Sequence, residues 1–487
     1  MFNVKKILFI IFFCFISIFI YQYLSSLFIA DFNEGYNLQI PLSLNENFIY
    51  QSRYEPRRIA DYKITVGFPQ HYLQLIFFKI FGVKLETVRL YTTSAFVILL
   101  ILSYFYAKSI FIAIYLFSFY LVASWFRIDI SQYNGEVTAT IFLILTIIFL
   151  GKYKQIDKKN KNYTLLILSS FIFSLAFSNK LISLLTIFLI FAFYRINFKE
   201  KIIFLFSGLF FYLIINIFII SYSYYLKFKT LDGLKSFLIT YKDNLWTTIL
   251  MNSSTIPFQI KKTGSLILNK INQFEGGYMN LLVIFILPFI FLIVKGELLF
   301  SLVSLFILLK IFLTMLWRHY IIFLLLLFLL TAKKWIKNKI YLFLITLVSI
   351  INILNFIFFI SRSYFSEIRL NNIKKEKQKE FAKKFDNIDG EIYTNGWWQP
   401  ANESFYLKKF FKDRMAYNQI NDKDNNFLLT FSYQDNAWPF TDLEKMCGEI
   451  VYCEKDYILC RMKKGIFFND LSDKNRQTKK CSKFNFN

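Results

Sequence analysis

The stretch that decides the fold runs from Arg127 to Leu150 and reads RIDISQYNGEVTATIFLILTIIFL. It begins with a polar segment that contains Asp129 and Glu136, and it continues as an uncharged apolar run. Such a run is typical of a membrane-spanning helix. Ionisable side chains beside it are costly unless they are paired or reach water, and they often mark functional sites. The stretch therefore predicts a membrane protein with chemistry at one end of its helices.

Apolar runs of this kind repeat along the first 360 residues, and 56% of all residues are hydrophobic, which is too apolar for an ordinary soluble domain. The net charge of +25 comes from Lys and Arg scattered between the runs, which indicates basic membrane-flanking loops and argues against nucleic-acid binding. The fold class is therefore a polytopic α-helical membrane protein with about 11 transmembrane helices. The expected spans are Ile7–Ile29, Leu90–Ala107, Ser109–Phe126, Val137–Leu150, Tyr163–Phe177, Leu181–Tyr194, Ile202–Tyr222, Tyr278–Val294, Leu298–Leu316, Tyr320–Ala332 and Ile340–Ile360.

The connections between the spans alternate in charge. One set of short connections is rich in Lys and Arg, and such connections are typically cytoplasmic. The other set carries the acidic residues and is expected on the exported side. An odd number of spans also exports the C-terminal part. These patterns predict a multi-pass protein of a bacterial inner membrane. The basic residues are Lys5, Lys6, Lys152, Lys154, Lys158, Lys159, Lys161, Arg195, Lys199, Lys201, Lys333, Lys334, Lys337 and Lys339.

The composition changes sharply after residue 360, so we expect a transmembrane domain over residues 1–360 and an exported domain over residues 361–487. The second part is long enough for a small α/β or α+β domain. Its patterns predict helices over Asn372–Phe385 and Ser404–Phe411 and strands over Glu391–Tyr393, Phe427–Phe431 and Tyr457–Met462.

Four of the five cysteines lie in this C-terminal part: Cys447, Cys453, Cys460 and Cys481. An exported domain is in an oxidising compartment, so we expect a disulfide among the first three. Two bridges among the four residues would allow three pairings. A zinc site is not expected, because both histidines lie far upstream and no CxxC is present.

Two carboxylates, Asp31 and Glu34, follow directly after the first expected span. A carboxylate at a membrane surface can accept a proton from a hydroxyl nucleophile. It can also hold a divalent cation, so a metal cofactor stays open at this point. The simpler interpretation is a solvated loop after a helix.

A long exported loop follows and contains His71, one of only two histidines in the chain. The adjacent segment Tyr72–Phe81 mixes apolar and polar residues and stops at Gly82, which predicts an exported amphipathic helix in the membrane interface. A lone histidine is more often structural than catalytic. His71 is nevertheless a candidate for substrate binding.

Further ionisable residues fall on the same expected face as Asp31. A polar hairpin between two spans is the simpler interpretation, but Ser or Asn would serve a hairpin equally well. Acids and bases on one face favour a functional site. These candidates are Asp129, Glu136, Lys180, Arg318 and His319. In the C-terminal part, Trp398 follows a predicted strand, where an aromatic ring could bind a sugar or simply pack the domain.

These residues resemble a family. Asn33-Glu34-Gly35-Tyr36, Thr65-Val66-Gly67-Phe68-Pro69, Gly135-Glu136, Lys180 and Arg318-His319-Tyr320 are similar in order and spacing to the GT-C superfamily of polyprenyl-phosphate-sugar-dependent glycosyltransferases. The nearest subgroups are the protein mannosyltransferases, the lipid A aminoarabinose transferases and the related rhizobial lipopolysaccharide transferases. The resemblance covers most of the membrane region. It departs at Asn33, where the family commonly has a catalytic Asp.

The resemblance implies transfer of a sugar from a polyprenyl-phosphate donor to an exported glycan, lipid or protein acceptor, as in cell-envelope and lipopolysaccharide biosynthesis. Lys180, Arg318 and His319 would then meet the donor phosphate, since cations bind phosphate strongly in a dry site. Asn33 cannot take a proton, so the base would be Asp31 or Glu34, with Asp31 favoured and Glu34 in support, unless the chain is a noncatalytic relative. The anomeric configuration would invert. Asp129 or Glu136 would orient the first loop or join a cation site. No nucleotide-binding motif is expected or seen.

Two other functions stay open. An O-antigen ligase or polysaccharide polymerase uses similar spans and exported arginines, although it has no obvious need for the early carboxylates. A lipid-linked sugar flippase would be expected to show paired halves and helices broken by Gly or Pro. The chain has only 7 Pro and 15 Gly and no visible repeat.

Overall fold

The computed structural model is mostly helical, with one mixed sheet near the C-terminus. It describes residues 4–29, 32–51, 67–122, 135–156, 163–231, 280, 283, 286–294, 297, 300–302, 304–305, 321–359, 365–386, 388–394, 405–406, 411–413, 426–431, 440–441, 447–453, 457–463 and 472–473.

The chain forms two compact units. The bundle unit comprises Met1–Ser26, Thr65–Tyr222 and Thr230–Arg369, and the sheet unit comprises Leu27–Ile64, Ser223–Lys229 and Leu370–Asn487. The sheet unit therefore takes a helix from the N-terminal region and the last residues of a long helix from the middle of the chain.

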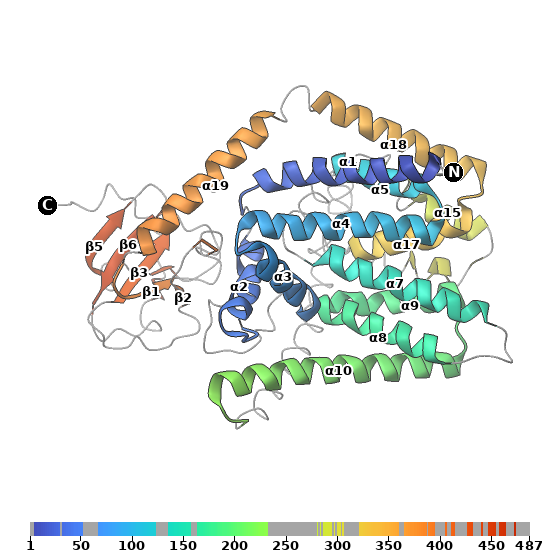
Figure 1. Cartoon of the computed structure of the whole chain (residues 1–487). Coiled ribbons are helices and arrows are strands. Elements are labelled where there is room, and N and C mark those ends of the chain that lie inside the picture. Colours follow the sequence, from blue (N-terminus) through green and yellow to red (C-terminus); the bar gives the residue numbers. More distant parts are fainter. Residues whose placement is uncertain are drawn as a thin grey trace. The chain divides into compact units, whose positions relative to one another are not determined.

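The bundle unit is built from helices that lie alongside one another (Figure 1). The most extensive helix contacts are between α7 and α8, between α5 and α18, and between α1 and α4. The helices are α1 Val4–Ser26, α3 Phe68–Phe81, α4 Leu85–Ala107, α5 Ile110–Val122, α7 Glu136–Gln155, α8 Thr164–Asn179, η2 Leu181–Leu185, α9 Thr186–Tyr194, α10 Phe198–Phe228, α15 Leu287–Val294, α17 Ile321–Trp335 and α18 Lys339–Phe359.

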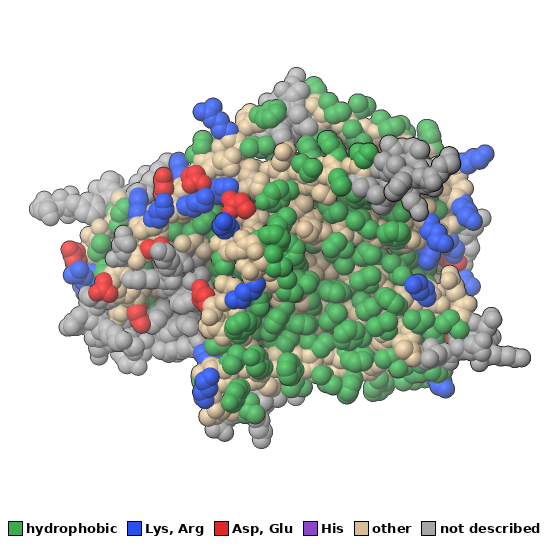
Figure 2. Space-filling model, viewed as in Figure 1, with side chains coloured by type: hydrophobic (Ala, Val, Ile, Leu, Met, Phe, Trp, Pro, Cys, Tyr) green, Lys and Arg blue, Asp and Glu red, His purple; other side chains and the backbone are tan. Residues whose placement is uncertain are grey.

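Within the described part of the chain, four helical segments are long and apolar enough to cross a membrane: Leu85–Ala107, Glu136–Gln155, Phe198–Phe228 and Lys339–Phe358. Only 22% of the apolar window of α10 is buried inside the protein, so most of its hydrophobic surface needs lipid to cover it. Figure 2 shows a broad hydrophobic surface over the helices. These features are those of a polytopic membrane protein. The predicted total of eleven spans stays a prediction.

Within the described residues, basic residues at the ends of α7, α9 and α17 lie at one end of the bundle unit. Glu297 pairs with both Arg195, at 3.0 Å, and Lys334, and so joins the ends of α9 and α17. Lys154, near the end of α7, pairs with Glu200 at 2.8 Å. Glu136 lies at the opposite end of α7, about 30 Å away at 1.5 Å per residue. The acidic and basic residues of this helix are therefore at opposite ends.

Helix α3 is too short to span a membrane, because its 14 residues extend only about 21 Å. Pro69 lies in its first turn, where a missing backbone N–H is harmless. Gly82 ends it with a positive φ of 81°, and the Gly82 carbonyl accepts the hydroxyl of Thr87 over 2.8 Å, which leads into α4. The predicted helix over Tyr72–Phe81 with a stop at Gly82 is therefore confirmed.

The sheet unit contains α2, Phe32–Asn47, and most of α19, Phe365–Asp386. The end of α10 is attached to the segment after α2, because Ser223 accepts the backbone N–H of Tyr50 at 3.1 Å and Lys227 donates to Gln51 at 2.9 Å. The five-stranded sheet has the order β2-β1-β3-β6-β5. Its strands are β1 Glu391–Thr394, β2 Phe411–Asp413, β3 Asn426–Phe431, β5 Cys447–Cys453 and β6 Tyr457–Met462, and a separate pair is β4 Phe440–Thr441 with β7 Ser472–Asp473.

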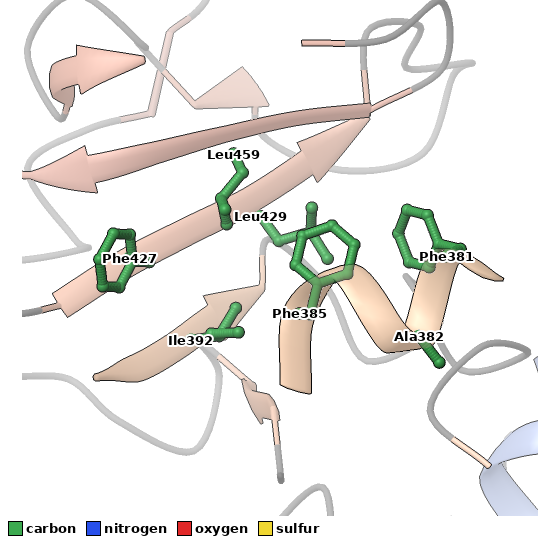
Figure 3. Packing of buried hydrophobic residues seen from close by; sticks show 7 residues of the cluster. All are labelled: Phe381, Ala382, Phe385, Ile392, Phe427, Leu429 and Leu459. Atoms are coloured by element: carbon green, nitrogen blue, oxygen red, sulfur yellow. The ribbon is translucent and has the colours of Figure 1, made fainter. Parts of the chain in front are cut away.

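The sheet is mixed. Strand β1 runs parallel to β2 and β3, whereas β6 runs antiparallel to both β3 and β5. One face packs against α19, which contributes the buried residues Phe381, Ala382 and Phe385; the rings of Phe381 and Phe385 point toward the strands in Figure 3. The opposing cluster residues are Ile392, Phe427, Leu429 and Leu459.

The three strands predicted from sequence are confirmed as β1, β3 and β6, and the predicted helix over Asn372–Phe385 is confirmed within the longer α19. The predicted helix over Ser404–Phe411 is described at only three of its residues. Phe405 and Tyr406 form a turn there, and Phe411 begins β2.

A disulfide between Cys447 and Cys460 joins the neighbouring strands β5 and β6, with the two Cα atoms 5.5 Å apart. The prediction of a bridge among Cys447, Cys453 and Cys460 is therefore confirmed. Cys453 is disulfide-bonded as well.

Candidate active site

Glu136 and Lys180 form a buried ion pair at the end of the bundle unit where α7 begins and α8 ends. The Nζ atom of Lys180 lies 2.7 Å from Oε1 of Glu136, and the side chains are 5% and 1% exposed. Gly135 precedes α7 with φ of +87°, a conformation that favours glycine. Lys180 follows α8 directly in an extended conformation. Two helix ends thus place opposite charges together in a site with almost no solvent contact.

Asn179 connects this pair to a third helix. Its Nδ2 donates to the carbonyl of Gly135 over 2.8 Å, and its Oδ1 accepts the backbone N–H of Gln70 over 3.2 Å. Its own carbonyl accepts the N–H of Gly67 over 2.8 Å. An asparagine from α8 therefore caps the N-terminus of α3 and holds the start of α7 at the same time. We call the group Gly67, Gly135, Glu136, Asn179 and Lys180 the three-helix junction.

Close backbone contact at the junction requires glycine at position 67. A Cβ atom there would lie 1.6 Å from the carbonyl oxygen of Ser178, far inside any real contact distance. The absence of a side chain lets the chain entering α3 lie directly on the last turn of α8. This explains why the motif around Gly67 and Pro69 is needed locally for the fold.

The energetics of the pair favour a functional role. Burying two charges costs several kcal/mol per ion, and their attraction often only offsets that cost. A buried pair is therefore weak evidence of added stability. Buried ionisable groups beside membrane-spanning helices are retained mainly where substrate or ion binding needs them.

Helix α3 has its polar side inward. Gln70, His71 and Gln74 are 2%, 0% and 0% exposed, whereas the apolar residues Ile76 and Ile80 are 52% and 66% exposed. Within the described residues, neither amide atom of Gln74 has a hydrogen-bond partner. The helix therefore presents uncharged hydrogen-bonding groups to the interior and apolar side chains to its surroundings.

Burial lowers the pKa of His71 to about 3, because the imidazolium form loses its hydration inside the protein. His71 is therefore neutral across the physiological pH range. A neutral imidazole can still donate one hydrogen bond and accept one. His71 can thus help to bind a substrate, but it does not supply a positive charge.

Glu34 lies in the first turn of α2, in the sheet unit, and is 1% exposed. A carboxylate in the first turn of a helix interacts favourably with the positive end of the helix dipole. Next to it, the carbonyl of Gly35 accepts a hydrogen bond of 2.8 Å from the side chain of Gln39. Glu34 is therefore an acid held inside the protein at a helix start.

The structure brings Glu136 and Lys180 into direct contact and places His71 in the first two turns of the helix that Asn179 caps. Glu34 belongs to the other unit. The remaining predicted site residues lie outside the described residues: Asp31, Asp129, Arg318, His319 and Trp398. In the part of the chain that the structure describes, no three His, Cys, Asp or Glu residues form a group suited to a metal ion.

Several buried polar residues were not predicted as site residues. Arg89, on α4, is only 1% exposed, and an arginine in a helix that is long and apolar enough to span a membrane is a signal that the sequence already carries. Asn179, Gln70 and Gln74 have no such signal, because an uncharged amide next to an apolar run is common. Their importance follows only from the packing of α3 against α8.

No family model matches the chain, and no curated protein matches it. The chain is similar to ArnT from Cupriavidus metallidurans. The crystal structure of that protein bound to undecaprenyl phosphate is 9% identical, covers 93% of this chain and 97% of its own, and has a TM-score of 0.48. The apo structure is also 9% identical, with 94% and 98% coverage and a TM-score of 0.48.

Proposed function

We propose that the protein is an integral membrane glycosyltransferase that moves a sugar from a polyprenyl-phosphate donor to an exported glycan, lipid or protein acceptor. The buried Lys180–Glu136 pair carries this proposal. It places a cation at a helix end of a bundle in which, among the described residues, four helices are long and apolar enough to cross a membrane. A donor with a long apolar tail and an anionic head needs both features.

Among the described residues, Lys180 is the best candidate for binding the phosphate of the sugar donor. An ammonium group has three N–H donors, so it can hold Glu136 with one and a phosphate oxygen with another. Glu136 fixes the direction of the lysine side chain, and the near absence of solvent strengthens any charge interaction there. Arg318 and His319 belong to the same proposed phosphate site on the sequence pattern alone. A neutral His71, with Gln70 and Gln74, suits the uncharged hydroxyls of a sugar.

The chemical step needs a base for the acceptor. In the proposed reaction the acceptor hydroxyl attacks the anomeric carbon, its proton passes to Asp31, and the bond to the lipid phosphate breaks. One such displacement inverts the anomeric configuration. Glu34 supports the loop. A carboxylate can take this proton when it lies within hydrogen-bond reach of the acceptor hydroxyl.

The site is proposed to face the exported side, and so is the C-terminal part, residues 361–487. The Cys447–Cys460 disulfide supports this orientation, since disulfides persist in oxidising compartments. So does the collection of basic connections at the other end of α7. Labelling cysteines introduced at Asp157 and Asp470 in intact cells tests it. Labelling of the first position, rather than the second, from outside would overturn the orientation.

The activity is tested with purified protein in lipid discs and a set of radiolabelled polyprenyl-phosphate sugars. We expect one donor to release its polyprenyl phosphate, and the label to move to an acceptor when an envelope extract is added. A flippase would instead move the donor across a liposome membrane without breaking the bond. Intact donor after incubation with every sugar tested would contradict the proposal.

A further inference from the structure

One side chain of α19 satisfies both backbone groups of Ile29. The Ile29 N–H donates to Oε1 of Gln378 over 3.3 Å, and Nε2 of Gln378 donates to the Ile29 carbonyl over 2.8 Å. Ile29 is 0% exposed and Gln378 is 9% exposed, so water does not compete for these bonds. The amide pairs with the main chain as a neighbouring strand would, across 349 positions of sequence.

The residue before Ile29 contacts the same helix. The Nζ atom of Lys374 lies 4.8 Å from the centre of the Phe28 ring, within the range of a cation–π interaction. Lys374 is four positions before Gln378, one turn of α19 away. Two consecutive residues of the N-terminal segment therefore contact two consecutive turns of α19.

Gln378 lies at the end of the stripe by which α19 packs on the sheet. Phe381, Ala382 and Phe385 follow it at spacings of three, four and seven and share its face of the helix. They are buried against the strands (Figure 3). The amide is thus attached to a rigid layer, and its position does not depend on the helix alone.

The segment that Gln378 holds leads directly into the first carboxylates. Ile29 precedes Asp31 by two residues and the start of α2 by three. Glu34 lies in the first turn of that helix and is buried. A neutral side-chain amide donates and accepts here at once, whereas a buried charge would be costly.

We propose that Gln378 is a positioning residue, which fixes the entry to α2 and thereby sets the carboxylates of the first loop for proton transfer. This inference rests on the proposed function. A general base must lie within about 2.6–3.2 Å of the proton it takes. A displacement of about 1 Å at a reacting group can lower the rate by roughly 100-fold.

The test uses the full chain in lipid discs and three variants. Gln378→Leu keeps most of the volume and removes both hydrogen bonds. Asn372→Leu makes a similar change at an exposed position of the same helix and is the matched control. Phe385→Leu loosens α19 on the sheet without touching the amide, and so it reports what general loosening does to activity.

Hydrogen exchange is the first readout. We expect the Ile29 amide in Gln378→Leu to exchange about two- to tenfold faster, as for the loss of one buried hydrogen bond, with no change in Asn372→Leu. The second readout is sugar transfer. We expect kcat to fall by roughly 100-fold while KM for the donor changes by less than about twofold. Phe385→Leu should lower the melting temperature, but it should not lower kcat selectively while KM stays constant.

Where Gln378→Leu does not accumulate, Gln378→Glu replaces it, because a carboxylate can accept the Ile29 N–H but cannot donate to the carbonyl. Unchanged exchange at Ile29, or a kcat equal to that of Asn372→Leu, would overturn the proposal. If the wild-type protein transfers no sugar from any donor, the proposed function fails. The exchange result then decides by itself whether Gln378 holds the segment.

Discussion

Lys180, directly after α8, contacts Glu136, the first residue of α7, across 2.7 Å in a site where both side chains are almost fully buried. Asn179, next to Lys180, holds the start of α7 and caps α3. The ion pair is thus attached to the ends of three helices. Its geometry is set by the bundle and not by a loop.

The pair should show strong coupling in a double-mutant cycle. Removing one partner leaves the other charge buried and should cost about 3–5 kcal/mol in the free energy of unfolding. The double variant Lys180→Met, Glu136→Leu should cost much less than the sum of the single changes. Thermal or denaturant unfolding in detergent measures this. Additive losses would show that the two residues do not form the pair.

Gly67→Ala should separate α3 from α8. Its new Cβ would meet the Ser178 carbonyl oxygen at 1.6 Å, so the backbone has to move, and we expect a loss of stability together with loss of activity. Gly208→Ala is the matched control, since its Cβ would lie 3.6 Å from the nearest atom, at ordinary contact distance. Equal melting temperatures for the two variants would contradict the close approach at Gly67.

His71 should make the protein less stable in acid. Its pKa is about 3 in the folded state and 6.5 when unfolded, so below pH 6.5 the unfolded state binds the proton and the folded state does not. The stability is complete above pH 6.5 and falls toward pH 3, by up to about 1.4 kcal/mol per pH unit.

Unfolding measured between pH 7 and pH 4 checks this, with His71→Gln as the comparison. The variant should lose the part of the pH dependence that His71 contributes. An identical slope in both proteins would mean that the imidazole is hydrated or already charged in the folded state.

Isosteric substitutions distinguish the roles of the two carboxylates, Asp31 and Glu34. Asp31→Asn should lower the rate of sugar transfer by about 10² to 10⁴, as expected for a lost general base. Glu34→Gln should have a smaller effect if Glu34 only supports the loop. A dead Glu34→Gln beside an active Asp31→Asn would exchange their roles, and full activity in both would remove the loop from the mechanism.

Much of the fold follows from sequence because its signals are local. The apolar run after Glu136, the stop at Gly82 and the strand pattern of Tyr457–Met462 each depend on neighbouring residues, and the structure has α7, the end of α3 and β6 at these places. The separation of basic and acidic residues along α7 is equally local, since it depends only on the two ends of one helix.

The site is harder to predict, because its contacts join distant residues. The sequence predicts only that Glu136 and Lys180 lie on the same face of the membrane. Their direct contact follows from the packing of α7 on α8. Asn179 and Gln378 carry no charge and belong to none of the quoted motifs, and Gly67 is one uncharged residue of the motif Thr65–Pro69. Each matters through a contact with main-chain atoms, which a sequence pattern does not encode.

The most direct test of the central claim, that Lys180 holds the donor phosphate for sugar transfer, is the rate of polyprenyl-phosphate release by wild-type protein, Lys180→Ala and Lys154→Ala. Lys154 is the control, because it pairs with Glu200 at the other end of α7. The account predicts a loss of about 100-fold for Lys180→Ala, typical of a donor removed from a charged transition state, and a near wild-type rate for Lys154→Ala. Equal rates in all three folded proteins would contradict it.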